Sequence, residues 1–322
     1  MSAPDTLETE TRVADAPDEP REVPETEKAQ ESPEGEVLDD PEKRREASAE
    51  LRQRVEGDWD ERPFKVDREE LGRFDLKRAG LPDVSIESSE KYVEEHRAAR
   101  PWLAAIDGAS PEARRIIVSM DVGGVHPQIR HEGWVGEEAN RRRVTYLEDP
   151  AQLDPAKRNQ GIDGIKPEDK PHWCAAIATR IADPDAFATA FVRGVQHPQV
   201  QDALATPFDP GKKLKPVTVP ISDLLGQNGH RHCTGWRLEP VDGSMKEARG
   251  NRDDWLDAKA AGREPDVPEP RASPVPTFKG GVITFLFSHD HDERRYKVAN
   301  QFVDPPAVPK EPDASVLLGA PS

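Results

Sequence analysis

Apolar residues recur at helical spacing in several segments of the chain. Phe187, Phe191 and Val195 fall on one face of a helix that begins at the Asp183-Pro184 pair, because residues four apart in a helix share a face. Capping residues, prolines and glycines mark the limits of similar segments. The pattern predicts helices at 41–57, 89–99, 111–122, 136–147, 184–196, 200–204 and 244–261.

Runs of β-branched and aromatic residues predict strands in other segments. Val217, Val219 and Ile221 alternate with polar residues, and Pro220 favours a sheet edge because proline has no amide proton to donate. The clearest hairpin joins two such runs through the polar sequence HDHDE. We expect strands at 173–182, 217–221, 234–238, 281–288 and 294–303. Helices and strands do not alternate regularly, which predicts an α+β fold with a small mixed or antiparallel sheet and packed helices.

The negative charge of the chain is concentrated at its beginning. Residues 1–60 carry 20 Asp and Glu against 8 Lys and Arg, which accounts for −12 of the net charge of −17. The first 38 residues have few large apolar side chains, so burial there cannot offset a chain entropy of about 1–2 kcal/mol per residue. We expect a disordered acidic tail at 1–40, either masking a basic site or keeping the protein soluble.

The remaining composition predicts how the rest of the chain is divided. We expect a helical adaptor at 41–122, an α+β domain at 123–305 with a proline-rich linker at 263–277, and a disordered C-terminal tail at 306–322. No run approaches the ~18 apolar residues of a membrane span, and no apolar segment marks a secretory signal. These features predict a soluble protein, either cytoplasmic or exported by a route other than the general secretory one.

Candidate chemistry gathers around His131 and the three arginines 141–143. Phosphodiester cleavage without a metal needs proton transfers near neutral pH, which histidine provides, and fixed positive charge, which arginine provides. The arginines spread over more than half of the predicted helix 136–147, so at least one faces the segment that carries His131. Alternatively, the arginines pair with Glu137 or Glu138 and His131 only packs.

A longer order of motifs includes these residues. His131 is close to a glycine, Arg142 follows eleven residues on, and then come the strand-to-helix unit ATRIADPDAFATAFV and a closing hairpin that ends in an aromatic residue and proline. This order resembles the RNase A-like toxin domain of bacterial contact-dependent growth inhibition and other polymorphic toxins. The resemblance implies catalytic roles for His131, as general acid or base, and for Arg142, as phosphate clamp. The family places threonine and tyrosine on the last strand, where this chain has Asn300 and Phe302.

The resemblance also implies partners and secondary residues. Arg180 and Asn300 become secondary phosphate ligands, RNA rather than DNA is the substrate, no metal or cofactor is required, and an immunity protein is the expected partner. It covers at most residues 126–305 and leaves an insertion at 199–275 unaccounted for. The runner-up hypothesis is a bacterial interaction protein that kept this scaffold and lost the chemistry, as the missing tyrosine hydroxyl at Phe302 favours.

A third hypothesis rests on the sequence GHRHC. His230, His232 and Cys233 offer ligand types that zinc accepts, with a fourth from His289, His291 or Cys174. On a strand, however, the two histidines share a face and the cysteine points the other way, so ordinary loop histidines are the alternative. With only two cysteines in the chain, buried free thiols are expected. No nucleotide-binding or serine-hydrolase motif is present.

Overall fold

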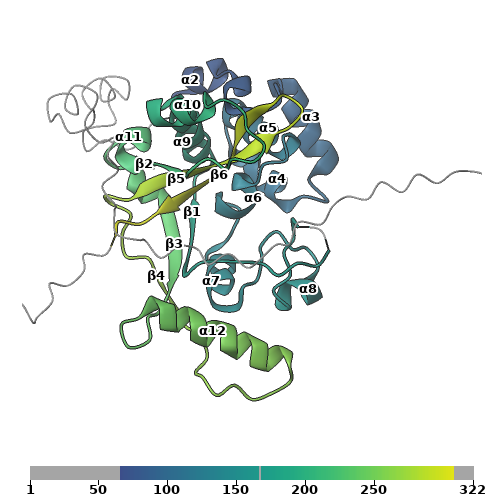
Figure 1. The fold of residues 1–322 in the computed structure, drawn as a ribbon. Helices are drawn as coiled ribbons and strands as arrows, with labels where there is room; N and C mark the ends of the chain where they lie inside the picture. Colours follow the sequence, from purple (N-terminus) through teal and green to yellow (C-terminus); the bar gives the residue numbers. More distant parts are fainter. Residues whose placement is uncertain (1–65, 167, 308–322) are drawn as a thin grey trace, which may run out of the picture. The chain divides into compact units, whose positions relative to one another are not determined.

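The computed structural model describes residues 66–166 and 168–307, and within them the fold is α+β, as predicted (Figure 1). The strands form two antiparallel sheets of three strands, ordered β1-β3-β4 and β2-β5-β6. Residues 1–65 and 308–322 lie outside the described part, and with them the expected acidic tail, the helix expected at 41–57 and nearly all of the expected C-terminal tail. No helix of the described residues is long and apolar enough to cross a membrane.

Helices occupy most of the chain before β1 and much of the insertion. The α-helices are α2 (Arg68–Arg73), α3 (Ile86–His96), α4 (Pro101–Ala105), α5 (Pro111–Val122), α6 (Pro127–His131), α7 (Glu137–Tyr146), α8 (Pro155–Asn159), α9 (Pro184–Gln196), α10 (Pro198–Leu204), α11 (Ile221–Leu225) and α12 (Met245–Ala260). Short 3₁₀ turns lie at η2 (Leu76–Ala79), η3 (Ile106–Gly108) and η4 (Gly229–His232).

The strands lie mostly where the sequence placed them. They are β1 (Ile177–Ile181), β2 (Val217–Pro220), β3 (Cys233–Leu238), β4 (Ala272–Pro274), β5 (Val282–Asp290) and β6 (Arg295–Asp304). The predicted hairpin is β5–β6, and β2 is an edge strand, as Pro220 indicated. Part of the expected linker instead forms β4 on β3, where Pro274 ends an edge strand and needs no ladder donor.

Local capping explains where the helices begin. Asp183 accepts a hydrogen bond from the backbone N–H of Ala186 at 2.8 Å, and Pro184 fills the first position of α9. The helix expected at 89–99 begins earlier, because Ser85 caps α3 by accepting from the N–H of Ser88. The strand expected from residue 173 begins later, since carbonyls before β1 accept hydrogen bonds from an arginine of α12 rather than from a strand.

The main core joins the early helices to the second sheet. Phe187 and Phe191 of α9 and Phe285 of β5 are fully buried in one cluster that also contains residues of α2, α3 and α5. Packing there is close: a Cβ on Gly194 would lie 1.9 Å from the ring of Phe285. The helices between 68 and 122 therefore share their core with α9 and β5.

The two sheets meet at β1 and β6. The hydroxyl of Thr179 in β1 donates a hydrogen bond to the carbonyl of Val303 in β6 at 2.6 Å. A second, smaller core lies between α7, β1, β3 and α12. The buried Arg252 fastens α12 there by donating to the carbonyls of Val144 and Cys174, each at 3.2 Å. The junction of the sheets is where the candidate site lies.

Candidate active site

His131 lies at the junction of the two sheets. It ends α6, and its ring Nδ1 lies 3.0 Å from the carbonyl oxygen of Thr179 in β1. Its ring also contacts that of Phe302 in β6, with centroids 5.5 Å apart. The residue is 8% exposed. Elements far apart in sequence thus hold one imidazole in a fixed orientation.

The hydrogen bond to Thr179 also fixes the protonation of the His131 ring. A carbonyl only accepts, so Nδ1 carries the proton, and in the neutral ring Nε2 is a bare acceptor. Nε2 makes no hydrogen bond to the described residues, so its lone pair is left available to accept a proton. Burial, and next the charge of Arg143, hold the pKa of His131 well below its usual value, which keeps the ring neutral.

The last strand brings Asn300 to the same face as Phe302, because alternate residues of a strand share a face. A bulge interrupts the β5–β6 ladder beside Leu286, and there the carbonyl of Ala299 accepts a hydrogen bond from the N–H of His126 at 3.3 Å. The side-chain oxygen of Asn300 is enclosed and has no partner among the described residues. Bulges commonly re-aim side chains near functional sites.

The three consecutive arginines separate into three environments. Arg141 pairs with Glu138 on the surface, as expected under the hypothesis that the arginines pair with nearby glutamates. Arg142 pairs with Glu148, donating from Nε at 2.7 Å, and its guanidinium lies 5.1 Å from the ring centre of Tyr146. Only Arg143 turns inward. Of the three, it alone appears among the charges that most affect the pKa of His131.

Arg143 is held from two sides. Its Nε donates to Nε2 of His172 at 3.2 Å, and its Nη1 donates to the carbonyl of Arg130 at 3.3 Å. Burial lowers the pKa of Arg143 from its usual value, but an arginine remains charged. The structure therefore sets a buried cation near His131, one position after the arginine that the family motif indicated.

Arg180 donates hydrogen bonds to backbone carbonyls near the site. It extends from β1, donating to the carbonyls of Gly133 and Val135 at 2.8 and 2.5 Å, and it pairs with Glu137 at 2.7 Å. Burial alone would raise the pKa of Glu137, but hydrogen bonds from Thr234, a tryptophan and Arg180 lower it. This network fixes the segment between α6 and α7, and it leaves few Arg180 donors for a phosphate.

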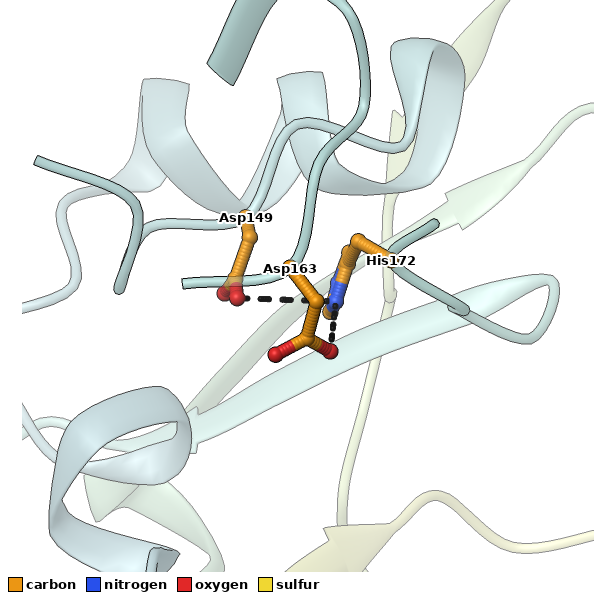
Figure 2. A group of neighbouring side chains, drawn as sticks. All are labelled: Asp149, Asp163 and His172. Carbon is orange, nitrogen blue, oxygen red and sulfur yellow. Dashed lines mark hydrogen bonds and ion pairs between the residues drawn. The ribbon is translucent and has the colours of Figure 1, made fainter. Parts of the chain in front are cut away.

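Asp149, Asp163 and His172 form a buried polar cluster (Figure 2), and His172 connects it to Arg143. His172 points its Nδ1 toward two carboxylates, 3.4 Å from Asp163 and 3.7 Å from Asp149. Because Nε2 accepts from Arg143, the proton of the neutral ring is on Nδ1. Burial lowers the pKa of His172 despite these carboxylates. Arg130 completes the cluster, with Nη2 at 2.5 Å from Asp149 and 2.9 Å from Asp163.

This cluster is better suited to holding loops than a metal. Ligand atoms of Asp149, Asp163 and His172 lie within 4.8 Å of one another. The guanidinium of Arg130, however, already supplies the positive charge between the carboxylates. Asp163 also accepts from the N–H groups of Ile165 and Lys166, each at 2.8 Å. Burial would raise the pKa of Asp163, yet the hydrogen bond from His172 and the charge of Arg130 lower it.

The residues of the zinc hypothesis do not form such a cluster. In the described part of the chain, the only group of three potential ligands with this spacing is that of Asp149, Asp163 and His172. His230 lies in η4 with its Nδ1 2.9 Å from the carbonyl of Gln227. Cys233 is a buried free thiol, and burial raises its pKa to about 12, so it stays protonated. Cys174 is also free and buried.

Several residues near His131 were not predicted from the sequence. Thr179 acts through its backbone carbonyl, which any residue would supply, so no sequence signal marks it. His126 is five residues before His131, and its enclosed Nδ1 has no partner. Burial, and next the charge of Arg130, lower the pKa of His126. The sequence signal for these residues is a cluster of two histidines and four arginines within residues 126–143.

Comparisons with models of protein families, with curated proteins and with solved structures found no match for this chain. The resemblance to RNase A-like toxins stays a prediction from short motifs.

Proposed function

We propose that this chain is a metal-independent ribonuclease of the bacterial toxin type, with His131 as its general base. The orientation of the His131 ring carries the proposal. Its Nδ1 donates to the carbonyl of Thr179, so the unprotonated Nε2 is left available to take up a proton. A positioned base with this geometry contributes roughly 10²–10⁴ in rate.

The proposed reaction uses the 2′-hydroxyl of RNA as nucleophile. Nε2 of His131 takes the hydroxyl proton, the 2′-oxygen attacks the adjacent phosphorus, and the 5′-oxygen leaves with a proton from water. The product carries a cyclic phosphate. The nearby buried charge of Arg143 supports this step, because a charge in a poorly solvated site acts more strongly on the developing anion than one in water.

The test is RNA cleavage by the full chain in excess EDTA. We expect cyclic phosphate ends, and we expect His131→Gln to reduce cleavage by at least ~100-fold. Glutamine can still donate to the carbonyl of Thr179 but cannot take up a proton. His230→Ala is the matched control, since this imidazole lies in η4, and it should cleave like the unmodified protein. Equal activity of the His131 and His230 variants would remove His131 from the mechanism.

A non-catalytic interaction protein on this scaffold is the second candidate. Two observations favour it: Phe302 lacks a hydroxyl, and Arg142 is paired with Glu148. Intact RNA after long incubation with folded protein would decide for this candidate. For the toxin reading, a small acidic open reading frame directly downstream is the expected source of an immunity protein.

A further inference from the structure

A groove lies between α7 and α12, on the side of α7 that carries Arg142. Its volume is about 1010 Å³, at the upper end of the range for small-molecule sites. Tyr146 and Arg142 of α7 and Trp255 and Lys259 of α12 line it, together with residues 159–162. The wall formed by α12 belongs to the insertion at 199–275, which the family resemblance does not cover.

Two aromatic rings, one from each helix, lie tilted against each other in this groove. The ring centres of Tyr146 and Trp255 are 5.7 Å apart at an angle of 39°, and both residues are half-buried. A cation accompanies each ring: Arg142 lies 5.1 Å from the centre of Tyr146, and Lys259 lies 5.5 Å from the centre of Trp255. Aromatic rings beside cations form the combination that binds successive bases of a single strand.

Hydrogen-bonding groups are also available in the groove. Asn159 and Gln160 are exposed, and their side-chain amides make no hydrogen bond to the described residues. Carboxamides can both donate and accept, as the edges of bases require. The carboxylates that line the groove are partly occupied, since Glu148 pairs with Arg142 and Glu269 accepts from the hydroxyl of Tyr146 at 2.6 Å.

We propose that this groove binds a nucleotide of single-stranded RNA, with the base stacked on Trp255 and a phosphate held by Lys259. The inference rests on the proposed function and adds to it the place where the substrate is held. Carboxylates and cations are nearly balanced in the groove, so stacking supplies most of the affinity. Two phosphate contacts at most should give a logarithmic salt slope no steeper than about −1.4.

The probe for this proposal is fluorescein-labelled 2′-O-methyl hexaadenylate. It lacks the attacking hydroxyl, so its binding is independent of cleavage. Anisotropy with the full chain should show Trp255→Ala weakening binding by at least ~10-fold, because one stacked base is worth about 1–3 kcal/mol. Trp255→Phe should stay within ~3-fold. Trp173→Ala is the matched control, since Trp173 is 58% exposed and does not line the groove.

A second variant keeps the proposal testable if the Trp255→Ala protein does not fold. Lys259 is exposed, so Lys259→Ala should fold normally and reduce the salt slope by about 0.7. Equal affinity of the Trp255→Ala and Trp173→Ala proteins, an unchanged salt slope, or no binding by the folded unmodified protein would overturn the proposal. His131→Gln should bind the probe normally. If the protein does not cleave RNA but its binding of the probe still depends on Trp255, the proposed ribonuclease activity is refuted and the proposed binding groove stands.

Discussion

His131 Nδ1 and the carbonyl oxygen of Thr179 are 48 residues apart in the sequence and 3.0 Å apart in the structure. This contact links α6 to β1, and Thr179 in turn links β1 to β6 through its hydroxyl. A single residue of β1 therefore determines both the tautomer of the imidazole and the junction of the two sheets.

The first prediction concerns the pH dependence of cleavage. Burial, and next the charge of Arg143, lower the pKa of His131, so the base remains unprotonated into acidic solution. The acidic limb of kcat/KM should therefore have its midpoint below the ordinary histidine value of about 6.5. Initial rates measured from about pH 4 to pH 8 check this. A midpoint at or above the ordinary value would contradict His131 as the base.

The second prediction concerns the position where the family has tyrosine. Phe302 contacts the His131 ring, so Phe302→Tyr places a hydroxyl beside the base. We expect cleavage to rise by roughly 10-fold, a modest effect for one added proton-transfer or hydrogen-bonding group. Phe208→Tyr is the control, because Phe208 packs on His289 and Tyr296 instead. Initial rates on one RNA compare the variants, and an equal response to both changes would separate Phe302 from the site.

The third prediction concerns the stability of the buried cluster. Arg130→Met removes the cation between Asp149 and Asp163 and leaves two buried carboxylates without their ion-pair partner. We expect a loss of about 3–5 kcal/mol in the free energy of unfolding. Arg141→Met breaks a surface pair with Glu138 and should cost less than about 1 kcal/mol. Urea unfolding measures the stability of both variants. Similar losses in the free energy of unfolding would show that the buried cluster contributes no more than a surface ion pair.

The fourth prediction concerns Glu132, which is 1% exposed. Burial raises its pKa from 4.5 to about 7, so the protonated form is favoured in the folded protein. The contribution of protonated Glu132 to the free energy of unfolding is complete below about pH 4.5 and is lost as the pH rises to about 7. Over that interval the stability of the protein relative to Glu132→Gln should fall by up to about 3 kcal/mol.

Urea unfolding of both proteins across this pH range provides the measurement for Glu132. The buried histidines titrate in the same range with the opposite sign, but both proteins contain them, so their effect cancels in the difference. Arg180 and Asp183 act on Glu132 from β1 and the loop after it, and both are also retained. A difference that does not change with pH would mean that Glu132 is ionised in the folded protein.

The fifth prediction concerns packing between α9 and β5. Gly194→Ala brings a methyl group to 1.9 Å from the ring of Phe285, and we expect a destabilisation of about 1–3 kcal/mol by overpacking. Gly250→Ala in α12 meets nothing within 4 Å and should stabilise by about 0.5–1 kcal/mol through helix propensity. Thermal unfolding compares the two, and a tolerated Gly194→Ala would mean that the core yields easily.

Local signals predicted the elements whose causes are local. α9 follows from its Asp-Pro cap and its spaced phenylalanines, and the β5–β6 hairpin follows from two β-rich runs around a polar turn. The division into two sheets was not predictable, because it depends on how β1 pairs with β3 across an insertion. β4 was missed for a similar reason: only pairing with β3 makes a strand of a proline-rich segment.

The candidate site was predicted in part. Sequence motifs selected His131, Asn300 and Phe302, which the fold brings to one junction. They selected Arg142, whereas the arginine whose charge reaches His131 is Arg143. A helix of ten residues presents consecutive arginines about 100° apart, and the sequence alone does not say which of them faces inward.

The placement of β6 has a consequence for synthesis of the protein. β6 is the last described strand, yet it closes on β1 through Val303 and on the segment before α6 through Ala299. A nascent chain therefore lacks both contacts until residue 304 has left the ribosome, however early α5 and α9 form. Chains that end before β6 would leave α6 and the edge of β5 that pairs with β6 uncovered. Such incomplete products should be recognised as unfolded and degraded.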